Sequence, residues 1–237
     1  NANSGTGSER SSTQKSMIFS ALKKFPFWRN YTTSQWSKWW VERPIDWKTA
    51  YLDTWKHPHR DMISAVLKEF DWGSLLEVGC GPGANLYNIL SHFKGKQLGG
   101  IDISPEAIKL AEKTFTGAFF KVCEAHDIMM SDSSTDVVLT DMTLIYFDPW
   151  KVKKALNEMK RVARRYIVLC EFHSESPLKR LWAWLTSGYY VHNYRRLLTK
   201  LGFYDVILIK VPANAWPGVD SRQEFRFILL AKVPKRK

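Results

Sequence analysis

The 237-residue chain lacks three features, and each absence argues against a class of protein. It has only three cysteines, Cys80, Cys123 and Cys170, and no Cys-x-x-Cys spacing, which argues against a disulfide framework or a zinc site. No apolar run reaches the roughly 18 residues of a membrane-spanning helix. The first residues also lack the charged-then-apolar pattern of a secretory signal. These absences favour a protein of the reducing cytoplasm.

Acidic residues are also scarce, since 23 Asp and Glu face 35 Lys and Arg, for a formal charge of +12. Basic residues gather in 151–165 and in a tail at 234–237. A surface for nucleic acid or anionic lipid would explain this excess. A solvated helix face with a basic tail explains it as well, so both interpretations stay open.

Aromatic residues, in contrast, are abundant near the N-terminus. Residues 1–16 are rich in Ser, Thr, Gly and Asn and predict a disordered leader. Six of the eleven tryptophans then fall within residues 28–55. We interpret residues 17–57 as an aromatic-rich cap over the domain that follows. The alternative is a peripheral contact with a membrane surface.

Residues 58–233 alternate between strand and helix patterns. Apolar runs predict strands at 74–80, 97–103, 118–124, 136–140 and 166–172, with helices between them. Ser104-Pro105 and Asp148-Pro149 each place an N-cap before a proline, which is typical of a helix start. Residues 203–211 and 224–233 alternate as a terminal antiparallel pair. We therefore predict an α/β fold, a seven-strand mostly parallel sheet with helices on both faces.

A glycine-rich segment, Glu77-Val-Gly-Cys-Gly-Pro-Gly83, follows the first predicted strand. Glycines at positions 79, 81 and 83 let the backbone turn sharply and approach a ligand closely. Their Gly-x-Gly-x-Gly spacing differs from the Gly-x-Gly-x-x-Gly of a dinucleotide site. The segment therefore indicates a nucleoside ligand that carries a charged amino-acid tail and no pyrophosphate.

Acidic residues end the next two strands. Asp102 can accept hydrogen bonds from both hydroxyls of a ribose. The third strand runs into Cys123-Glu-Ala-His-Asp127, where an acid can accept from the adenine amine and the next backbone N–H can reach a ring nitrogen. We favour Glu124 and Ala125 for these contacts, with Asp127 as the alternative.

Residues 72–203 resemble the class I S-adenosylmethionine (SAM)-dependent methyltransferase superfamily, in its small-molecule, lipid or glycan branch. Segment 77–83 resembles the first motif of the family, Asp102 matches its ribose-binding acid, and 136–141 and 166–171 resemble its fourth and fifth strands. The resemblance implies that SAM is the cofactor and S-adenosylhomocysteine the product. The cofactor-binding residues expected on these grounds are Glu77, Gly79, Cys80, Gly81, Gly83, Asp102, Ile103, Glu124, Ala125 and Asp141.

Methyl transfer to an oxygen or a protonated nitrogen needs a base within hydrogen-bond reach. The candidates come from loops at the carboxyl ends of strands, and they are His173, which we favour, then His192, Asp141 and Tyr146. A structural role is expected for His57 and His59. No metal-ligand pair is evident, so we expect no metal.

Residues 174–190 form an insertion in which Leu178, Leu181, Trp182 and Leu185 make an apolar stripe. The insertion is either a lid over the acceptor pocket or an amphipathic helix packed on the core. We expect methyl transfer to an O or N of a small-molecule, lipid or glycan acceptor. The alternatives are an RNA- or protein-directed methyltransferase and a non-catalytic SAM-binding module.

Overall fold

The computed structural model describes residues 32–215 and 222–235. The predicted leader, the first part of the aromatic segment (17–31) and the last two residues of the basic tail lie outside the described residues. The division of the chain at residues 16, 57 and 233 stays a prediction. Within the described residues, no helix has the length and apolar character needed to cross a bilayer.

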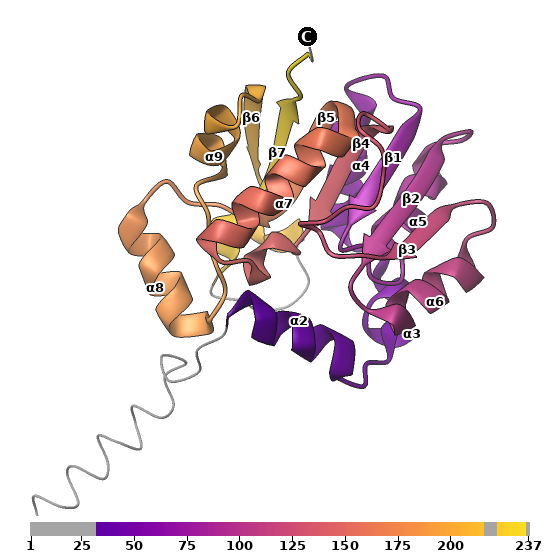
Figure 1. Ribbon diagram of the computed structural model, residues 1–237, viewed down its shortest axis with the longest axis horizontal. Coiled ribbons are helices and arrows are strands. Elements are labelled where there is room, and N and C mark those ends of the chain that lie inside the picture. The colour runs from indigo at the N-terminus through magenta and orange to yellow at the C-terminus, as the bar shows by residue number, and fades with distance from the viewer. Residues whose placement is uncertain (1–31, 216–221, 236–237) are drawn as a thin grey trace, which may run out of the picture.

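A seven-stranded sheet forms the centre of the molecule, in the order β3-β2-β1-β4-β5-β7-β6 (Figure 1). Strands β1 to β5 pair in parallel, and β7 lies antiparallel between β5 and β6. This arrangement confirms the predicted fold class. The strands are β1 (Ser74–Val78), β2 (Gln97–Asp102), β3 (Phe119–Val122), β4 (Thr135–Asp141), β5 (Ala163–Phe172), β6 (Tyr204–Lys210) and β7 (Arg226–Lys232).

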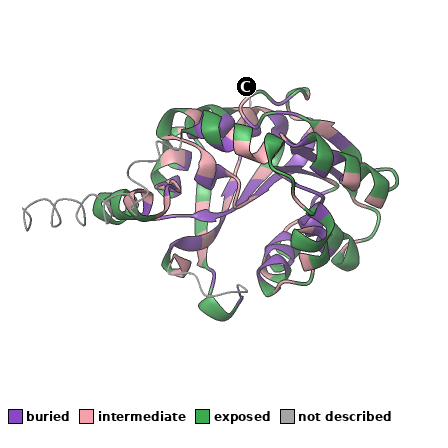
Figure 2. Cartoon of the chain, turned by 90° about the horizontal axis from the view of Figure 1, so that it is seen from below, coloured by how far each residue is buried: buried purple, intermediate pink, exposed green. Residues whose placement is uncertain are grey.

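Eight α-helices surround the sheet in the described part of the chain. They are α2 (Thr33–Glu42), α3 (Trp47–Ala50), α4 (Pro58–Lys68), α5 (Ala84–His92), α6 (Pro105–Thr114), α7 (Pro149–Val162), α8 (Pro177–Ser187) and α9 (Tyr194–Lys200). Side chains of α4, α5 and α6 share one apolar core with the sheet, and those of α7 and α9 share another. The alternation of β4 divides these cores, because Val137 and Leu139 face the first and Val138 faces the second. Figure 2 shows the buried strands between the more exposed helices.

The predicted N-caps are confirmed. The hydroxyl of Ser104 accepts a hydrogen bond from the N–H of Ala107 at the start of α6. A carboxylate oxygen of Asp148 accepts from the N–H groups of Trp150 and Lys151 at the start of α7. In both helices a proline occupies the first turn, where no hydrogen bond needs its missing N–H.

Helices α2 and α3 lie over the carboxyl ends of the parallel strands (Figure 1). Thr33, the first residue of α2, ties the helix to the start of α7. Its Oγ1 donates to Asp148 Oδ2 at 2.7 Å and accepts from the Asp148 N–H at 2.9 Å. The strand order reverses between β1 and β4, so α2 and α3 cover the crevice where open α/β sheets bind ligands.

Candidate functional site

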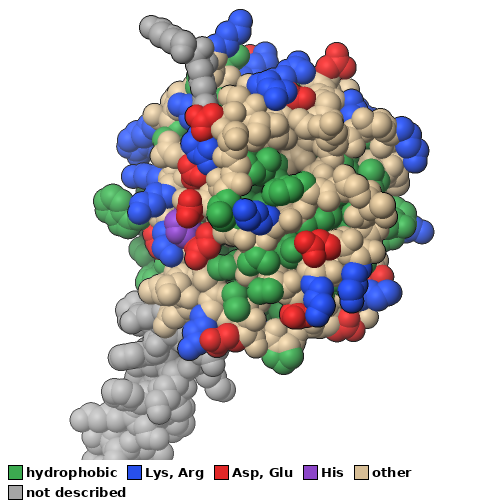
Figure 3. All heavy atoms as spheres, turned by 45° about the vertical axis from the view of Figure 1, so that its right-hand side comes forward, with side chains coloured by type: hydrophobic (Ala, Val, Ile, Leu, Met, Phe, Trp, Pro, Cys, Tyr) green, Lys and Arg blue, Asp and Glu red, His purple; other side chains and the backbone are tan. Residues whose placement is uncertain are grey.

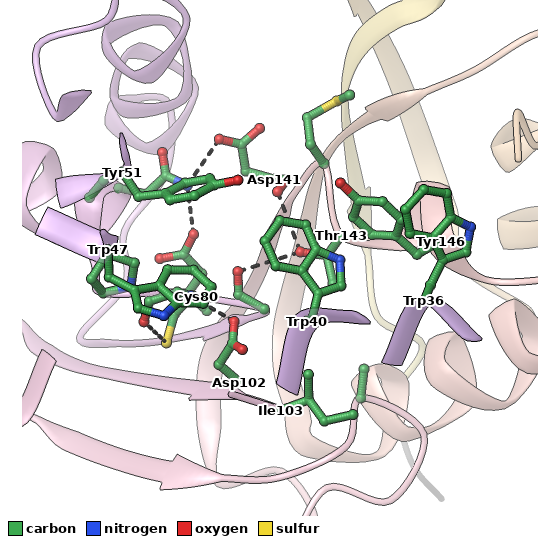
Figure 4. Close-up of a pocket in the computed structure, with 18 of the residues that line it drawn as sticks. Trp36, Trp40, Trp47, Tyr51, Cys80, Asp102, Ile103, Asp141, Thr143 and Tyr146 are labelled. Atoms are coloured by element: carbon green, nitrogen blue, oxygen red, sulfur yellow. Dashed lines mark hydrogen bonds between the residues drawn. The ribbon is translucent and has the colours of Figure 1, made fainter. Parts of the chain in front are cut away.

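A pocket of about 360 Å³ lies at the carboxyl ends of β1, β2 and β4. The glycine-rich segment and the loops after β2, β3 and β4 form one side of it. Residues of α2 and α3 and the turn at Leu52–Thr54 form the other side (Figure 4). The pocket therefore brings the predicted glycine loop and the aromatic N-terminal segment together.

The glycine loop requires glycine at its first position. Gly79 has a φ of +73°, and a Cβ there would overlap the side chain of Thr143. Its N–H and that of Cys80 both donate to the carbonyl of Ile101, at 2.7 and 3.0 Å. Gly81 has a φ of +52° and would place a Cβ toward Trp47, within the pocket lining. The bare backbone at these two positions leaves the pocket open beside β1.

Asp102, the last residue of β2, holds this loop in place. Its Oδ2 accepts from the N–H of Gly81 at 2.8 Å, and its Oδ1 accepts from the N–H of Ser104 at 2.8 Å. Burial raises the pKa of this carboxyl, and the backbone N–H donors oppose that rise. Each carboxylate oxygen has two lone pairs, so capacity for a ligand's hydroxyl groups remains.

A buried polar cluster connects β1, β4 and two helices. Asn85 of α5 donates through Nδ2 to Glu77 Oε1 at 2.6 Å and to Asp141 Oδ2 at 3.1 Å. Burial raises the pKa of Glu77 to about 8, although the hydrogen bond from Asn85 opposes the rise. Glu77 Oε2 is buried with no hydrogen-bond partner among the described residues. A positively charged group in the pocket would therefore stabilise the ionised form of Glu77.

The second carboxylate of this cluster, Asp141, has two basic neighbours. His59 Nε2 lies 3.1 Å and Arg60 NH1 3.2 Å from its Oδ2. Burial alone would raise the pKa of Asp141, but the charges and hydrogen bonds of these neighbours hold it well below its usual range. Asp141 Oδ1, like Glu77 Oε2, has no hydrogen-bond partner among the described residues. Two buried oxygen atoms in one pocket fit a ligand that carries an ammonium group.

A row of aromatic rings forms the opposite side of the pocket, and we call it the aromatic wall. Trp47 lies 5.9 Å from Trp40 between ring centroids, and Trp40 lies 5.4 Å from Tyr146. Trp36 then lies 4.9 Å from Tyr146 and stacks on Tyr189 at 5.5 Å. Tyr146 meets Trp36 and Trp40 at large angles between the rings, and Figure 4 shows the three side by side. The wall thus offers a long apolar surface to an acceptor.

The loop after β4, which carries Tyr146, is held by a buried acid. Glu171 Oε1 accepts from the N–H groups of Thr143 and Leu144 at 2.9 and 3.0 Å. Burial raises the pKa of Glu171 to about 8, and these backbone donors oppose the rise. Met142 in the same loop has a φ of +52°, a left-handed conformation that costs energy outside glycine. The loop is therefore fixed in shape where it meets the pocket.

Most of the predicted cofactor residues lie together in the pocket lining. They are Glu77, Gly79, Cys80, Gly81, Asp102, Ile103, Glu124, Ala125 and Asp141, and the catalytic candidate Tyr146 lies with them. Glu124 pairs with His126 at 2.9 Å. Gly83 does not line the pocket. It has a φ of +91° and caps the start of α5, where a Cβ would overlap Phe115.

The structure does not bring His173 or His192 into the pocket. His173 Nδ1 accepts from the N–H of Tyr194 at 3.1 Å. His192 bonds through Nε2 to the carbonyl of Phe147 at 2.9 Å. The two residues form an isolated parallel bridge, and both side chains are buried. Our first two candidates for the base therefore do not line the pocket.

Sequence reasoning missed several residues of the site. His57 and His59, for which we expected a structural role, line the pocket together with Arg60 and Asn85. The sequence did contain a signal for these residues. Three polar side chains gather in His57-Pro-His-Arg60, at the start of a helix, and two of them, His59 and Arg60, are buried. Tyr51 was also not singled out, although it lies in the lining beside Trp47.

Comparison with known proteins agrees with this geometry. Residues 75–165 match the family model described as a methyltransferase domain. Among curated proteins, none matches the chain. Residues 75–165 thus carry a methyltransferase domain, and the seven-stranded sheet around them has the fold of class I SAM-dependent methyltransferases.

Three solved structures illustrate the shared fold. A methyltransferase from Haloferax volcanii, solved in complex with a methyltransferase activator, is 19% identical, with a TM-score of 0.59 over 77% of this chain and 92% of that one. The PH0226 protein of Pyrococcus horikoshii OT3 is 16% identical, with a TM-score of 0.58 over 83% and 95%. Geranyl diphosphate methyltransferase, in complex with GPP and sinefungin, is 14% identical, with a TM-score of 0.58 over 74% and 78%.

Proposed function

We propose that the protein transfers a methyl group from SAM to an oxygen or nitrogen of a small-molecule, lipid or glycan acceptor that lies against the aromatic wall. One observation carries the proposal. A single pocket joins the glycine loop and Asp102 to the rings of Trp36, Trp40 and Tyr146. Such a pocket suits a compact or narrow acceptor whose reacting end enters beside the cofactor.

SAM supplies a methyl group that is already activated on a sulfonium. In our proposal, Asp102 accepts from its ribose hydroxyls, and the bare backbone at Gly79 and Gly81 lies along its methionine part. The open oxygens of Glu77 and Asp141 receive its ammonium group. Four further residues of the lining, Cys80, Ile103, Glu124 and Ala125, surround the adenosine.

The protein's own task is then to hold the acceptor in line and to take up a proton. We propose His57 as the base among the described pocket residues. Burial lowers its pKa, with the charges of Arg60 and His59 adding to the effect. The imidazole is therefore neutral near pH 7 and able to accept a proton. Asp141 is a poor base, because His59, Arg60 and Asn85 hold its pKa well below its usual range and its carboxylate has little affinity for a proton.

The aromatic wall also offers a polar contact. The indole Nε1 of Trp40 is buried and has no hydrogen-bond partner among the described residues. Trp40 stands between Tyr51 and Tyr146 in the pocket (Figure 4). We propose that this N–H donates to an oxygen of the acceptor, which would orient an otherwise apolar molecule.

Four of the seven basic residues of 151–165 are engaged within the protein and give little support to the RNA-directed alternative. Lys160, Arg161 and Arg164 donate to Leu201, Glu158 and Asp136, and Arg165 donates to the carbonyl of Asp71. Arg164 and Arg165 lie in the amino-terminal part of β5, whereas the pocket lies at the carboxyl ends of the strands. Figure 3 shows basic side chains spread around one face and interleaved with acidic ones. A continuous positive groove beside the pocket would be needed for RNA.

The cofactor proposal is tested by calorimetry with SAM and with NAD. We expect SAM to bind and NAD not to bind. Asp102→Ala removes charge-assisted hydrogen bonds and should weaken SAM binding by about thirtyfold. Glu106→Ala, which changes an exposed acid in the first turn of α6, should bind SAM as the parent does. Equal SAM affinity of Asp102→Ala and the parent would contradict the ribose assignment.

The acceptor is tested by labelled-methyl transfer from SAM into separate lipid, glycan, small-molecule and RNA pools. We expect label in one of the first three pools and none in RNA. Label in RNA that disappears as salt rises would contradict the acceptor class and support the alternative. Conversion of SAM to S-adenosylhomocysteine with any acceptor would exclude a non-catalytic module.

A further inference from the structure

Helix α8 carries apolar side chains on its outer surface. Leu178 is 77% exposed, Leu181 52% and Trp182 48%, and Ala183 is the one residue of the helix that is fully buried. Leu178, Leu181 and Trp182 recur at helical spacing, so they form one stripe. We call these three residues the α8 stripe. In Figure 1 the helix projects from the body of the molecule.

Helix α8 is connected to the aromatic wall through its buried side. Ala183 packs in a small apolar cluster with Ile145 and Phe172, against which Tyr146 and Tyr189 also pack. Tyr189 follows directly after α8 and stacks on Trp36 of the wall. Apolar contacts therefore join the buried side of α8 to the aromatic wall.

Basic residues outnumber acidic ones in the segment that carries the stripe. Residues 174–200 contain five basic residues, Lys179, Arg180, Arg195, Arg196 and Lys200, and one acid, Glu175. Two of these bases make exposed ion pairs, Lys179 with Glu224 and Arg195 with Glu175, and such pairs are weak.

Lys151, Lys153 and Lys154 lie in the first turns of α7, at the same end of the sheet as the start of α9. Apolar side chains, a tryptophan and surrounding bases are the features of a helix that lies on an anionic bilayer.

We propose that α8 docks the enzyme on an anionic membrane surface, with the α8 stripe inserted between the lipids, and that the acceptor is an amphiphile drawn from that membrane along the aromatic wall. The substrate part of this inference rests on the proposed function. The docking part does not, because it concerns a surface outside the pocket. Leu178, Leu181 and Trp182 do not line the pocket.

The docking part is tested by co-sedimentation of the full chain with vesicles. We compare phosphatidylcholine vesicles with vesicles that also contain phosphatidylglycerol. The parent should bind the anionic vesicles and bind the neutral ones weakly. Leu181→Glu places a charge in the stripe and should lower the partition coefficient by about tenfold or more. Met129→Glu is the matched control, since it makes the same change at a residue that is 62% exposed in the loop after β3. It should bind as the parent does.

Three results would overturn the docking proposal. The parent could fail to bind anionic vesicles, Leu181→Glu could bind as well as the parent, or Met129→Glu could lose as much binding as Leu181→Glu. Light scattering would show whether the stripe instead joins two copies of the chain. A dimer that Leu181→Glu dissociates, without vesicle binding by the parent, would replace the membrane with a second copy.

A separate assay tests the substrate part. SAM affinity, measured without vesicles, should be the same in Leu181→Glu and the parent. Labelled-methyl transfer into vesicle lipids should fall about tenfold in the variant together with binding. Loss of vesicle binding with unchanged transfer into the vesicles would overturn the membrane source of the acceptor. Failure of SAM binding in the parent would instead count against the proposed function and leave the vesicle result intact.

Discussion

The two sides of the pocket are built in different ways. On the cofactor side, backbone hydrogen bonds hold the glycine loop to the end of β2, from Gly79 to the carbonyl of Ile101 and from Gly81 to the carboxylate of Asp102. On the acceptor side, Trp36, Trp40 and Tyr146 meet from separate segments and touch through ring faces and edges. The shape of the cofactor side is therefore set by the backbone, whereas that of the acceptor side is set by the surfaces of side chains.

This difference teaches which substitutions each side tolerates. A loop whose backbone is its binding surface cannot accept even one added carbon where the φ angle is positive. A wall of rings can change composition while keeping its apolar character, because packing of this kind is less directional than hydrogen bonding. We therefore expect small changes to abolish cofactor binding and larger ones only to shift acceptor affinity.

The largest effect is expected from Gly79→Ala. The added Cβ would overlap Thr143 in a backbone conformation that alanine avoids, so the loop must move. A displaced binding loop should weaken SAM binding by about 100-fold. Calorimetry measures this change.

Gly95→Ala is the control for backbone strain. Gly95 has a φ of +69°, but a Cβ there would meet nothing within 4 Å. The variant should lose some stability and keep its SAM affinity. Equal SAM affinity of Gly79→Ala and Gly95→Ala would contradict the claim that the backbone of the glycine loop forms the cofactor-binding surface.

Trp40→Ala should have the next largest effect and act on the acceptor side alone. It removes a ring from the middle of the wall and an unpaired N–H, so KM for a water-soluble acceptor should rise by about tenfold. SAM affinity should change little. Trp150→Ala, at a ring that is 77% exposed outside the pocket, should leave KM unchanged. A loss of SAM affinity in Trp40→Ala equal to its loss of acceptor affinity would erase the distinction between the two sides.

A smaller effect, on stability, is expected from the pH dependence of Glu171. Burial raises its pKa in the folded protein to about 8, whereas the ordinary value is 4.5. The folded state therefore holds a proton that the unfolded state releases above pH 4.5. This contribution to stability is fully present below pH 4.5 and is lost as the pH rises through 8.

Glu171→Gln cannot ionise and can still accept through its amide oxygen. The Tm of the parent should therefore fall between pH 6 and pH 9 by about 3 °C more than that of the variant. Thermal melts at the two pH values measure the difference. Glu175→Gln, at an exposed acid, should follow the parent. Parallel pH curves for Glu171→Gln and the parent would show that Glu171 does not titrate in this range.

The smallest effect on turnover is expected from His173→Ala. The side chain bonds to the Tyr194 N–H outside the pocket, so kcat per folded molecule should stay within about twofold of the parent. Turnover against pH, with folded protein counted by circular dichroism, is the measurement. His57→Ala in the same assay should lose turnover, and the remaining turnover should no longer fall as the pH is lowered. The reverse result would restore His173 as the base.

Much of the fold and of the cofactor side could be predicted from local patterns. The proline-led helix starts at Ser104 and Asp148 depend on neighbouring residues only. So do the left-handed glycines at 79 and 81. The pairing of Glu77 with Asp141 through their shared donor Asn85 could not be predicted, because Asn85 lies on the next helix and Asp141 at the end of a strand far along the chain.

The sequence by itself determined the parallel sheet, its reversal point and the glycine loop with Asp102, because alternation, capping and glycine geometry act over a few residues. Only the tertiary structure decided which side chains share the pocket. It placed His57 there and left His173 outside, and it joined α2, the loop after β4 and the buried side of α8 through apolar contacts. The physical reason is that long-range packing sets where a side chain points once its strand or helix has formed, and no local pattern encodes that direction.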